Sequence, residues 1–236
     1  MQPPLDARSQ TARDNFLKLG VSISPIPAAE DKEVWRVDQN AGDPTQLEHM
    51  ESLLEDCQLA LNTGLRDEKL IDRRLPSILS GAFAKMKRAH LSTEESDTST
   101  ADHPPRLYGQ QRLLANVVHE GKTENVRTTV DYTLVYGRRN RMAVNLVILK
   151  ENSLDMQDKT WEALTAMGTI QRQKKNPGDN TGIYGLHTNS FEWHFLHLGA
   201  GSEYSALKLS WDTDKSQIIG LLEKICKQAI DLATKN

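Results

Sequence analysis

The stretch TTVDYTLVYGRRNRMAVNLVIL, residues 128–149, decides the fold of this chain. Its first part, residues 128–136, is rich in β-branched and aromatic side chains, which favour strands. Its last part, residues 142–149, is a continuous apolar run, and residues 137–140 between them have the composition of a turn. The stretch therefore predicts two paired β-strands.

Outward from this pair, the periodicity of apolar residues predicts further helices and strands. Spacings of three and four residues predict amphipathic helices over residues 45–62, 68–90, 156–173 and 214–234, with Pro76 expected to break or kink the second. Strands are predicted over residues 183–187, 192–198 and 204–211, whereas residues 107–119 fit a strand or a short helix. The order predicts an α/β fold with a central mixed sheet flanked by helices.

At 236 residues the chain can form one large or two small domains, and 38% hydrophobic residues suffice for a sizeable core. We expect one domain over residues 1–236. Residues 1–44 are interpreted as an N-terminal arm, 45–91 as a helical part and 106–236 as the α/β core. Residues 92–105 have almost nothing to bury, so we expect a mobile loop.

Composition excludes several classes of protein. A formal net charge of -3 gives no overall basic footprint for nucleic acid. No apolar stretch approaches the roughly 18–20 residues that span a membrane, and residues 1–30 lack the apolar block of a secretory signal. We therefore expect an intracellular protein, in cytoplasm or nucleus, with no membrane partner. Cys57 and Cys226 lie within apolar helical patterns, which argues against a disulfide scaffold or a cysteine zinc site.

Four segments together resemble a known family. They are DYTLVYG at 131–137, NLVILKE at 145–151, ALTAMG at 163–168 and IYGLHTNSFEWHF at 183–195. They are similar to the PD-(D/E)XK, or restriction-endonuclease-like, nuclease domains found in many fungal proteins. In that family an Asp begins one strand, an acidic-x-Lys triplet ends the next, a Gln-bearing helix follows, and a Tyr-Gly strand leads into an aromatic-rich hairpin. The resemblance covers residues 106–236 and implies a restriction-endonuclease-like core with an N-terminal helical extension.

The resemblance implies a Mg²⁺ site in which two carboxylates hold the ion and a lysine activates water. Asp131 matches the first carboxylate, but the triplet reads Ile-Leu-Lys150 in one register and Leu-Lys-Glu151 in the other. Because side chains alternate along a strand, Asp131 is expected to share a cluster with Lys150 or with Glu151, and with both only if a bulge intervenes. Either register lacks the second strand carboxylate.

Two other carboxylates are candidates to complete this site. Glu162 stands on the following helix where related domains bear a Gln, so its oxygen atoms offer a replacement ligand. Glu51, on the first helical part, is a weaker candidate metal ligand. The alternative interpretations stay open: Glu162 and Glu51 as solvated helix residues, and Asp131 as a local hydrogen-bond acceptor.

Histidines and arginines suggest two further sites. His187, His194 and His197 are candidate zinc or copper ligands. However, a spacing of three places His194 and His197 on opposite faces of a strand, which favours ordinary strand histidines. Residues 106–150 hold eight basic against three acidic residues, and a cluster in one turn is a candidate DNA or RNA contact: Arg138, Arg139 and Arg141. A solvated charged turn explains them equally well.

The leading hypothesis is a nuclease-fold protein with a degenerate metal site, retained to bind nucleic acid or a protein partner. One alternative is an active Mg²⁺-dependent endonuclease completed by Glu162 or Glu151. Another is a regulatory or effector scaffold for protein interaction. Fold alone does not decide among the three, and the sequence leaves the oligomeric state open.

Overall fold

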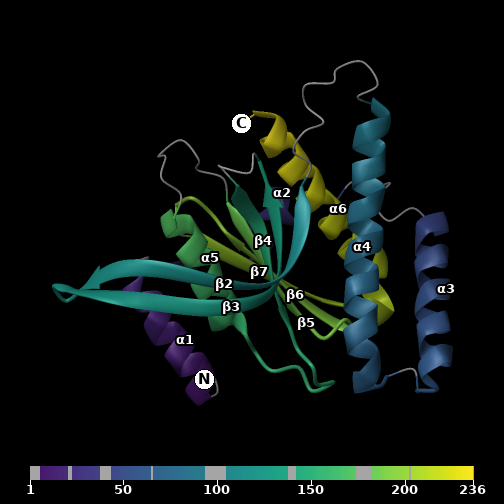
Figure 1. Ribbon diagram of the computed structural model, residues 1–236, viewed down its shortest axis with the longest axis horizontal. Helices are drawn as coiled ribbons and strands as arrows, with labels where there is room; N and C mark the ends of the chain where they lie inside the picture. Colours follow the sequence, from purple (N-terminus) through teal and green to yellow (C-terminus); the bar gives the residue numbers. More distant parts are fainter. Residues whose placement is uncertain are drawn as a thin grey trace.

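The computed structural model describes residues 6–20, 23–37, 44–64, 66–93, 105–137, 142–173, 182–201 and 203–235. Its elements follow one another along the chain as α1 (Ala7–Lys18), β1 (Ser24–Pro25), α2 (Lys32–Trp35), α3 (Pro44–Leu61), α4 (Glu68–Thr93), β2 (Arg106–His119), β3 (Lys122–Tyr136), β4 (Ala143–Lys150), α5 (Thr160–Gln173), β5 (Ile183–Thr188), β6 (Glu192–Leu198), β7 (Glu203–Ser210) and α6 (Trp211–Lys235). Figure 1 shows their arrangement.

One sheet joins the described strands in the order β1-β7-β6-β5-β4-β3-β2. Strands β3 and β4 are antiparallel, as the opening stretch predicts. Strands β4 and β5 are parallel, and α5 makes the crossover between them. The predicted mixed sheet flanked by helices is confirmed.

Helices cover both faces of this sheet. Leu146 and Ile148 of β4 pack into a core with α3, α4 and α6, while Val147 and Leu149 pack into a second core with α1 and α5. Gly185 of β5 lets α5 approach, because a Cβ atom there would lie 2.5 Å from the Sδ atom of Met167. The two cores explain why β4 is apolar on both faces.

Several predicted boundaries change in the structure. Residues 107–119 lie in a strand, β2, which settles the alternative left open. Helix α4 runs through Pro76 without the predicted break, because Leu75, Ile78 and Leu79 around the proline are fully buried. The helix predicted over residues 156–173 begins only at Thr160. Residues 94–104 of the predicted mobile loop, and residues 138–141 of the predicted turn, lie outside the described residues.

The N-terminal segment contributes to the second core. Helix α1 packs on α5, and its Phe16 and the following Leu19 are both 0% exposed. The Arg172 guanidinium donates a hydrogen bond of 2.6 Å to the carbonyl of Leu19. Part of the segment interpreted as an arm is therefore integral to the fold.

Strands β2 and β3 extend beyond the rest of the sheet as a two-stranded ribbon (Figure 1). Strand β3 pairs with β4 only from Tyr132 onward, whereas it pairs with β2 along almost its whole length. The ladder between β2 and β3 is interrupted opposite Asp131, at Gln110, whose φ of 33° is left-handed. Asp131 thus lies where the ribbon leaves the sheet.

Among the described helices, none combines the length and the apolar character needed to cross a membrane.

Candidate functional site

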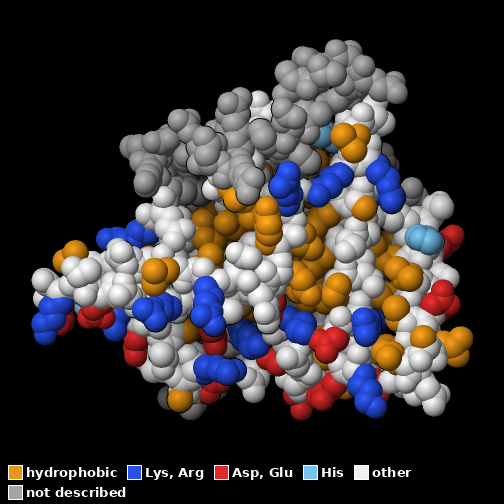
Figure 2. Space-filling model, in the orientation of Figure 1, with side chains coloured by type: hydrophobic (Ala, Val, Ile, Leu, Met, Phe, Trp, Pro, Cys, Tyr) orange, Lys and Arg blue, Asp and Glu red, His pale blue; other side chains and the backbone are white. Residues whose placement is uncertain are grey.

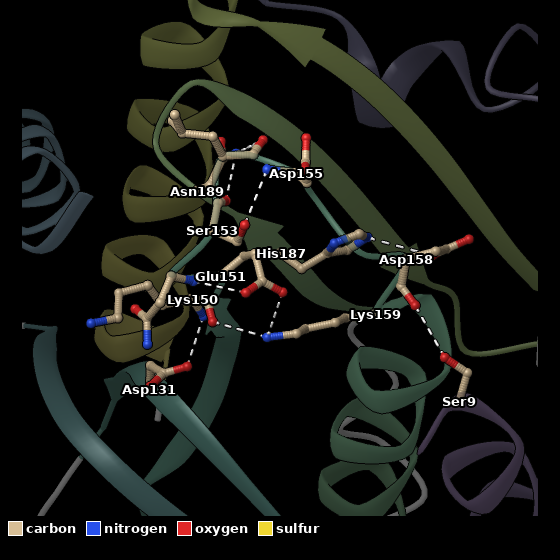
Figure 3. A network of polar contacts seen from close by, with 12 residues as sticks. Ser9, Asp131, Lys150, Glu151, Ser153, Asp155, Asp158, Lys159, His187 and Asn189 are labelled. Carbon is tan, nitrogen blue, oxygen red and sulfur yellow. Dashed lines mark hydrogen bonds and ion pairs between the residues drawn. The ribbon is translucent and has the colours of Figure 1, made fainter. Parts of the chain in front are cut away.

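The charged residues of the two possible triplets lie at the carboxyl end of β4 (Figure 3). The Oδ2 atom of Asp131 accepts a hydrogen bond of 2.7 Å from the backbone N–H of Lys150. Because the β3–β4 ladder ends at Tyr132 and Ile148, this carboxylate takes the position of a backbone acceptor. The structure therefore brings Asp131 and Lys150 together through the main chain of Lys150.

The side chains of Lys150 and Glu151 have different partners, as the alternation argument predicts. The Lys150 ammonium forms an ion pair with Asp72 of α4. The Oε2 atom of Glu151 lies 3.1 Å from the Nζ atom of Lys159, just before α5. The side chains of Glu151 and Lys159 are only 12% and 17% exposed, so this ion pair is largely desolvated.

Sequence reasoning missed Lys159, which links the end of β4 to the start of α5. Its Nζ atom also donates a hydrogen bond of 3.1 Å to the carbonyl of Lys150. A cation at a helix N-terminus is mildly unfavourable next to the helix dipole, so a lysine there gains from an anionic partner. The sequence shows a lysine near the start of a predicted helix, but it does not show that Glu151 is its partner.

Glu162 lies in the first turn of α5 and is half-buried. Burial raises the pKa of its carboxyl, and the charges that act on it come from Asp6, Lys159 and Arg8. Its Oε2 atom is buried and has no hydrogen-bond partner among the residues that the structure describes. The charges that influence Glu162 therefore come from the start of α1 and from Lys159.

The remaining predicted ligands and contacts lie elsewhere. Glu51 of α3 forms an ion pair with Lys215 of α6, so its carboxylate connects two helices. Arg138, Arg139 and Arg141 lie outside the described residues.

The residues at this site do not fit a magnesium ion as they are arranged. Mg²⁺ is usually held by one or two carboxylates whose oxygen atoms are open to the ion, together with several water molecules. Here the Glu151 carboxylate is neutralised by an ammonium, the Asp131 carboxylate accepts a backbone bond, and leucine or isoleucine stands at the acidic position of the triplet. Across the described ranges, no group of three or more His, Cys, Asp and Glu side chains is arranged to hold a metal ion.

The three strand histidines divide into two places. His187 and His194 lie opposite each other on β5 and β6, with 3.2 Å between Nε2 of the first and Nδ1 of the second. Burial lowers the pKa of His187 to about 3 and that of His194 to about 4. His197 instead lies 3.3 Å from the carboxylate of Asp31. The histidines thus form no shared cluster of three.

The loop after β5 supports the same end of the sheet. The side-chain amide of Asn189 donates to the carbonyls of Ser153 and Leu154, and its Oδ1 atom accepts from the backbone N–H groups of Phe191 and Glu192. The β4–α5 connection and the β5–β6 turn are therefore held together by one buried side chain.

The β2–β3 ribbon has a buried face and an exposed face. Over residues 111–119 and 123–130 of the ribbon, exposed and covered residues alternate, with Val117 and Val126 buried against α1 and α5. The exposed face contains four directly opposed pairs with no acidic member: Arg112 with Thr129, Leu114 with Arg127, Asn116 with Asn125, and Val118 with Thr123. This face is a second candidate site, made of cations, amides and small apolar groups.

Comparison with protein-family models found no match, and a search of the curated proteins found no related sequence.

Proposed function

We propose that this chain is a restriction-endonuclease-like domain that binds duplex DNA without metal-dependent cleavage. The order of elements supports the resemblance. Asp131 lies in β3, the altered triplet ends β4, helix α5 follows, and Tyr184-Gly185 in β5 leads into the hairpin of β5 and β6 that bears Trp193 and Phe195.

One observation supports the absence of cleavage: each candidate catalytic side chain at the end of β4 already has a partner within the chain. Asp131 accepts from the Lys150 main chain, Lys150 pairs with Asp72, and Glu151 pairs with Lys159. A general base or a metal ligand needs an oxygen or nitrogen atom available to water or to the ion. These internal partners favour a structural role for each group.

The exposed face of the ribbon supports DNA binding. The major groove of B-form DNA is about 12 Å wide and admits a two-stranded β-ribbon. Arg112 and Arg127 are exposed and suited to phosphates or guanine, and the opposed Asn116 and Asn125 are suited to adenine. The major groove of A-form RNA is too narrow for such a ribbon, which favours DNA as the partner.

The test incubates the protein with plasmid DNA, single-stranded DNA and RNA, each with Mg²⁺ or Mn²⁺. We expect no cleavage, and binding to a DNA duplex that weakens steeply as salt concentration rises. The double variant Arg112→Ala/Arg127→Ala is expected to bind about ten- to a hundredfold more weakly and with a smaller salt slope. Lys69→Ala/Arg73→Ala is the matched control, since it removes two exposed charges from α4.

Two results would overturn this proposal. Cleavage that disappears in Asp131→Ala would establish an active endonuclease, with Glu151 or Glu162 as the next residues to test. Absence of both cleavage and duplex binding at low salt would favour a protein-interaction scaffold instead.

A further inference from the structure

Arg74 of α4 is a buried cation without an anionic partner of its own. The residue is only 8% exposed, and within the described part of the chain it makes neither a hydrogen bond nor an ion pair. Its Nε atom is enclosed and has no acceptor there. Burial lowers the pKa of its guanidinium to about 10, against the opposing effect of Asp212. Buried charges in proteins are generally paired, so an unpaired one indicates a place where an anion binds.

Two aromatic rings lie against this guanidinium. Its Cζ atom is 4.4 Å from the centre of the Phe191 ring and 5.7 Å from that of Trp211. Arg66 approaches the same Phe191 ring, with 5.6 Å between its Cζ atom and the ring centre. The two guanidinium groups are thus neighbours at one ring, and contact with the ring leaves their N–H donors available.

Arg74 adds a positive charge that its neighbours do not neutralise. The carboxylates that act on it are those of Asp212, in the first turn of α6, and Glu51 of α3. Asp212 is paired with Arg66, and Glu51 is paired with Lys215. Figure 2 shows side chains of both charge signs over the N-terminal half of α4. These five residues therefore leave one excess positive charge.

The outer nitrogen atoms of both guanidinium groups are open to a ligand. The Nη1 and Nη2 atoms of Arg74 are not enclosed, in contrast to its Nε atom. The Arg66 side chain is 52% exposed and contacts Asp212 through its Nη2 atom. Arginine presents a planar set of donors that matches the oxygen atoms of a phosphate group, so two adjacent arginines favour such an anion.

We propose that Arg74 and Arg66 bind a phosphate group where α4 meets the turn between β5 and β6 and the start of α6. The group is inorganic phosphate or a phosphodiester of a nucleic acid, because both offer the same acceptor oxygen atoms. It supplies the negative charge that Arg74 does not receive from Asp212 or Glu51. These residues lie outside the β2–β3 ribbon, so the proposal does not depend on the proposed DNA-binding function.

The test titrates inorganic phosphate into the full-length protein, with chloride at equal ionic strength as the reference. The midpoint of thermal unfolding and the Nε–H resonance of Arg74 in NMR spectra measure binding, and we expect both to change saturably with phosphate. Arg74→Met is expected to weaken phosphate binding about ten- to a hundredfold, because it removes charge-assisted hydrogen bonds. Arg73→Met, at the neighbouring exposed position of α4, is the matched control and is expected to bind as the parent does.

Two further variants keep the proposal testable should Arg74→Met fail to fold. Arg66→Ala changes an exposed side chain and is expected to weaken phosphate binding about tenfold. Arg74→Lys keeps the charge without the planar donor set and is expected to bind several-fold more weakly. Equal responses of the parent to phosphate and to chloride would overturn the proposal, as would phosphate binding that neither the Arg66 nor the Arg74 variants weaken.

Duplex DNA distinguishes the two sources of the phosphate group. Weaker duplex binding by Arg74→Met, with Arg73→Met as the control, identifies a phosphodiester of the duplex as the ligand. Unchanged duplex binding, together with loss of phosphate binding, identifies free phosphate. Failure of the ribbon to bind DNA would leave the phosphate titration unaffected, so the two proposals fail separately.

Discussion

The Oδ2 atom of Asp131 accepts a hydrogen bond of 2.7 Å from the backbone N–H of Lys150, at the point where β3 separates from β4. In a continued ladder, a β3 carbonyl would accept from that N–H group. The carboxylate that the family resemblance assigns to a metal ion thus ends the sheet here. A metal ligand and an acceptor for the Lys150 N–H group require different properties of residue 131, and substitutions there distinguish the two roles.

Asp131→Ala is expected to lower the free energy of unfolding by about 1–3 kcal/mol, because it leaves the Lys150 N–H without an acceptor in a partly buried place. Asp131→Asn keeps a side-chain oxygen and is expected to cost less. Urea denaturation of both variants measures the difference. The control is Asp155→Ala, an exposed change on the loop after β4. An Asp131→Ala variant as stable as the parent would contradict the structural role.

The Glu151–Lys159 ion pair is expected to be strongly coupled, because both side chains are largely withdrawn from water. Lys159→Met leaves a desolvated carboxylate without its partner, so a loss of about 3–5 kcal/mol is expected. The double variant Glu151→Leu/Lys159→Met removes both charges and is expected to recover much of that stability. A double-mutant cycle based on unfolding free energies measures the coupling.

The exposed pair Glu33 and Arg36 is the comparison for this cycle. Its members are separated by 3.8 Å and extend into solvent, so their coupling is expected to be much smaller. Equal couplings for the two pairs would show that burial does not strengthen the Glu151–Lys159 contact.

The sequence predicts the parts of the fold that local periodicity encodes. The strand pair around residues 137–140, the hairpin of β5 and β6 and the helix α6 follow from apolar alternation or from spacings of three and four. Residues 107–119 stayed ambiguous because only one face of that ribbon is buried, and its apolar residues are interrupted by Asn116 and Arg112.

Within the candidate site, the sequence predicted only the contact that follows from the pairing of neighbouring strands. The strand pairing predicted Asp131 near Lys150 or Glu151, and the Asp131 carboxylate accepts a hydrogen bond from the backbone N–H of Lys150. The pairing of Lys150 with Asp72 joins residues 78 positions apart, through the packing of α4 on the sheet. Likewise, the loop between Glu151 and Lys159 has no periodicity from which their contact could be inferred.

Helix α1 is expected to behave as part of the core. Phe16 is 0% exposed and packs with Leu19 and Ala166 in the second core, so Phe16→Ala is expected to cost about 3–5 kcal/mol. Leu17→Ala, one residue along, is the matched control, because Leu17 is 56% exposed. Thermal and urea unfolding measure both. A Phe16→Ala variant as stable as Leu17→Ala would show that α1 is a dispensable arm.

Acid is expected to destabilise the protein through the pair His187 and His194. Burial lowers the pKa of both imidazoles below the unfolded value of 6.5, and His194 and Lys208 lower that of His187 further against the opposing effect of Asp158. The folded state therefore binds fewer protons than the unfolded state below about pH 6.5. This contribution to stability is fully present above pH 6.5 and is lost as the pH falls toward 4 and then 3.

For His187, which is 0% exposed, the loss approaches about 1.4 kcal/mol per pH unit within that window. His187→Asn/His194→Asn removes both titrating rings and is expected to flatten the dependence of unfolding free energy on pH between 6.5 and 4. Parallel pH profiles for the parent and the double variant would mean that the buried imidazoles are not the groups that acid must protonate to unfold the chain.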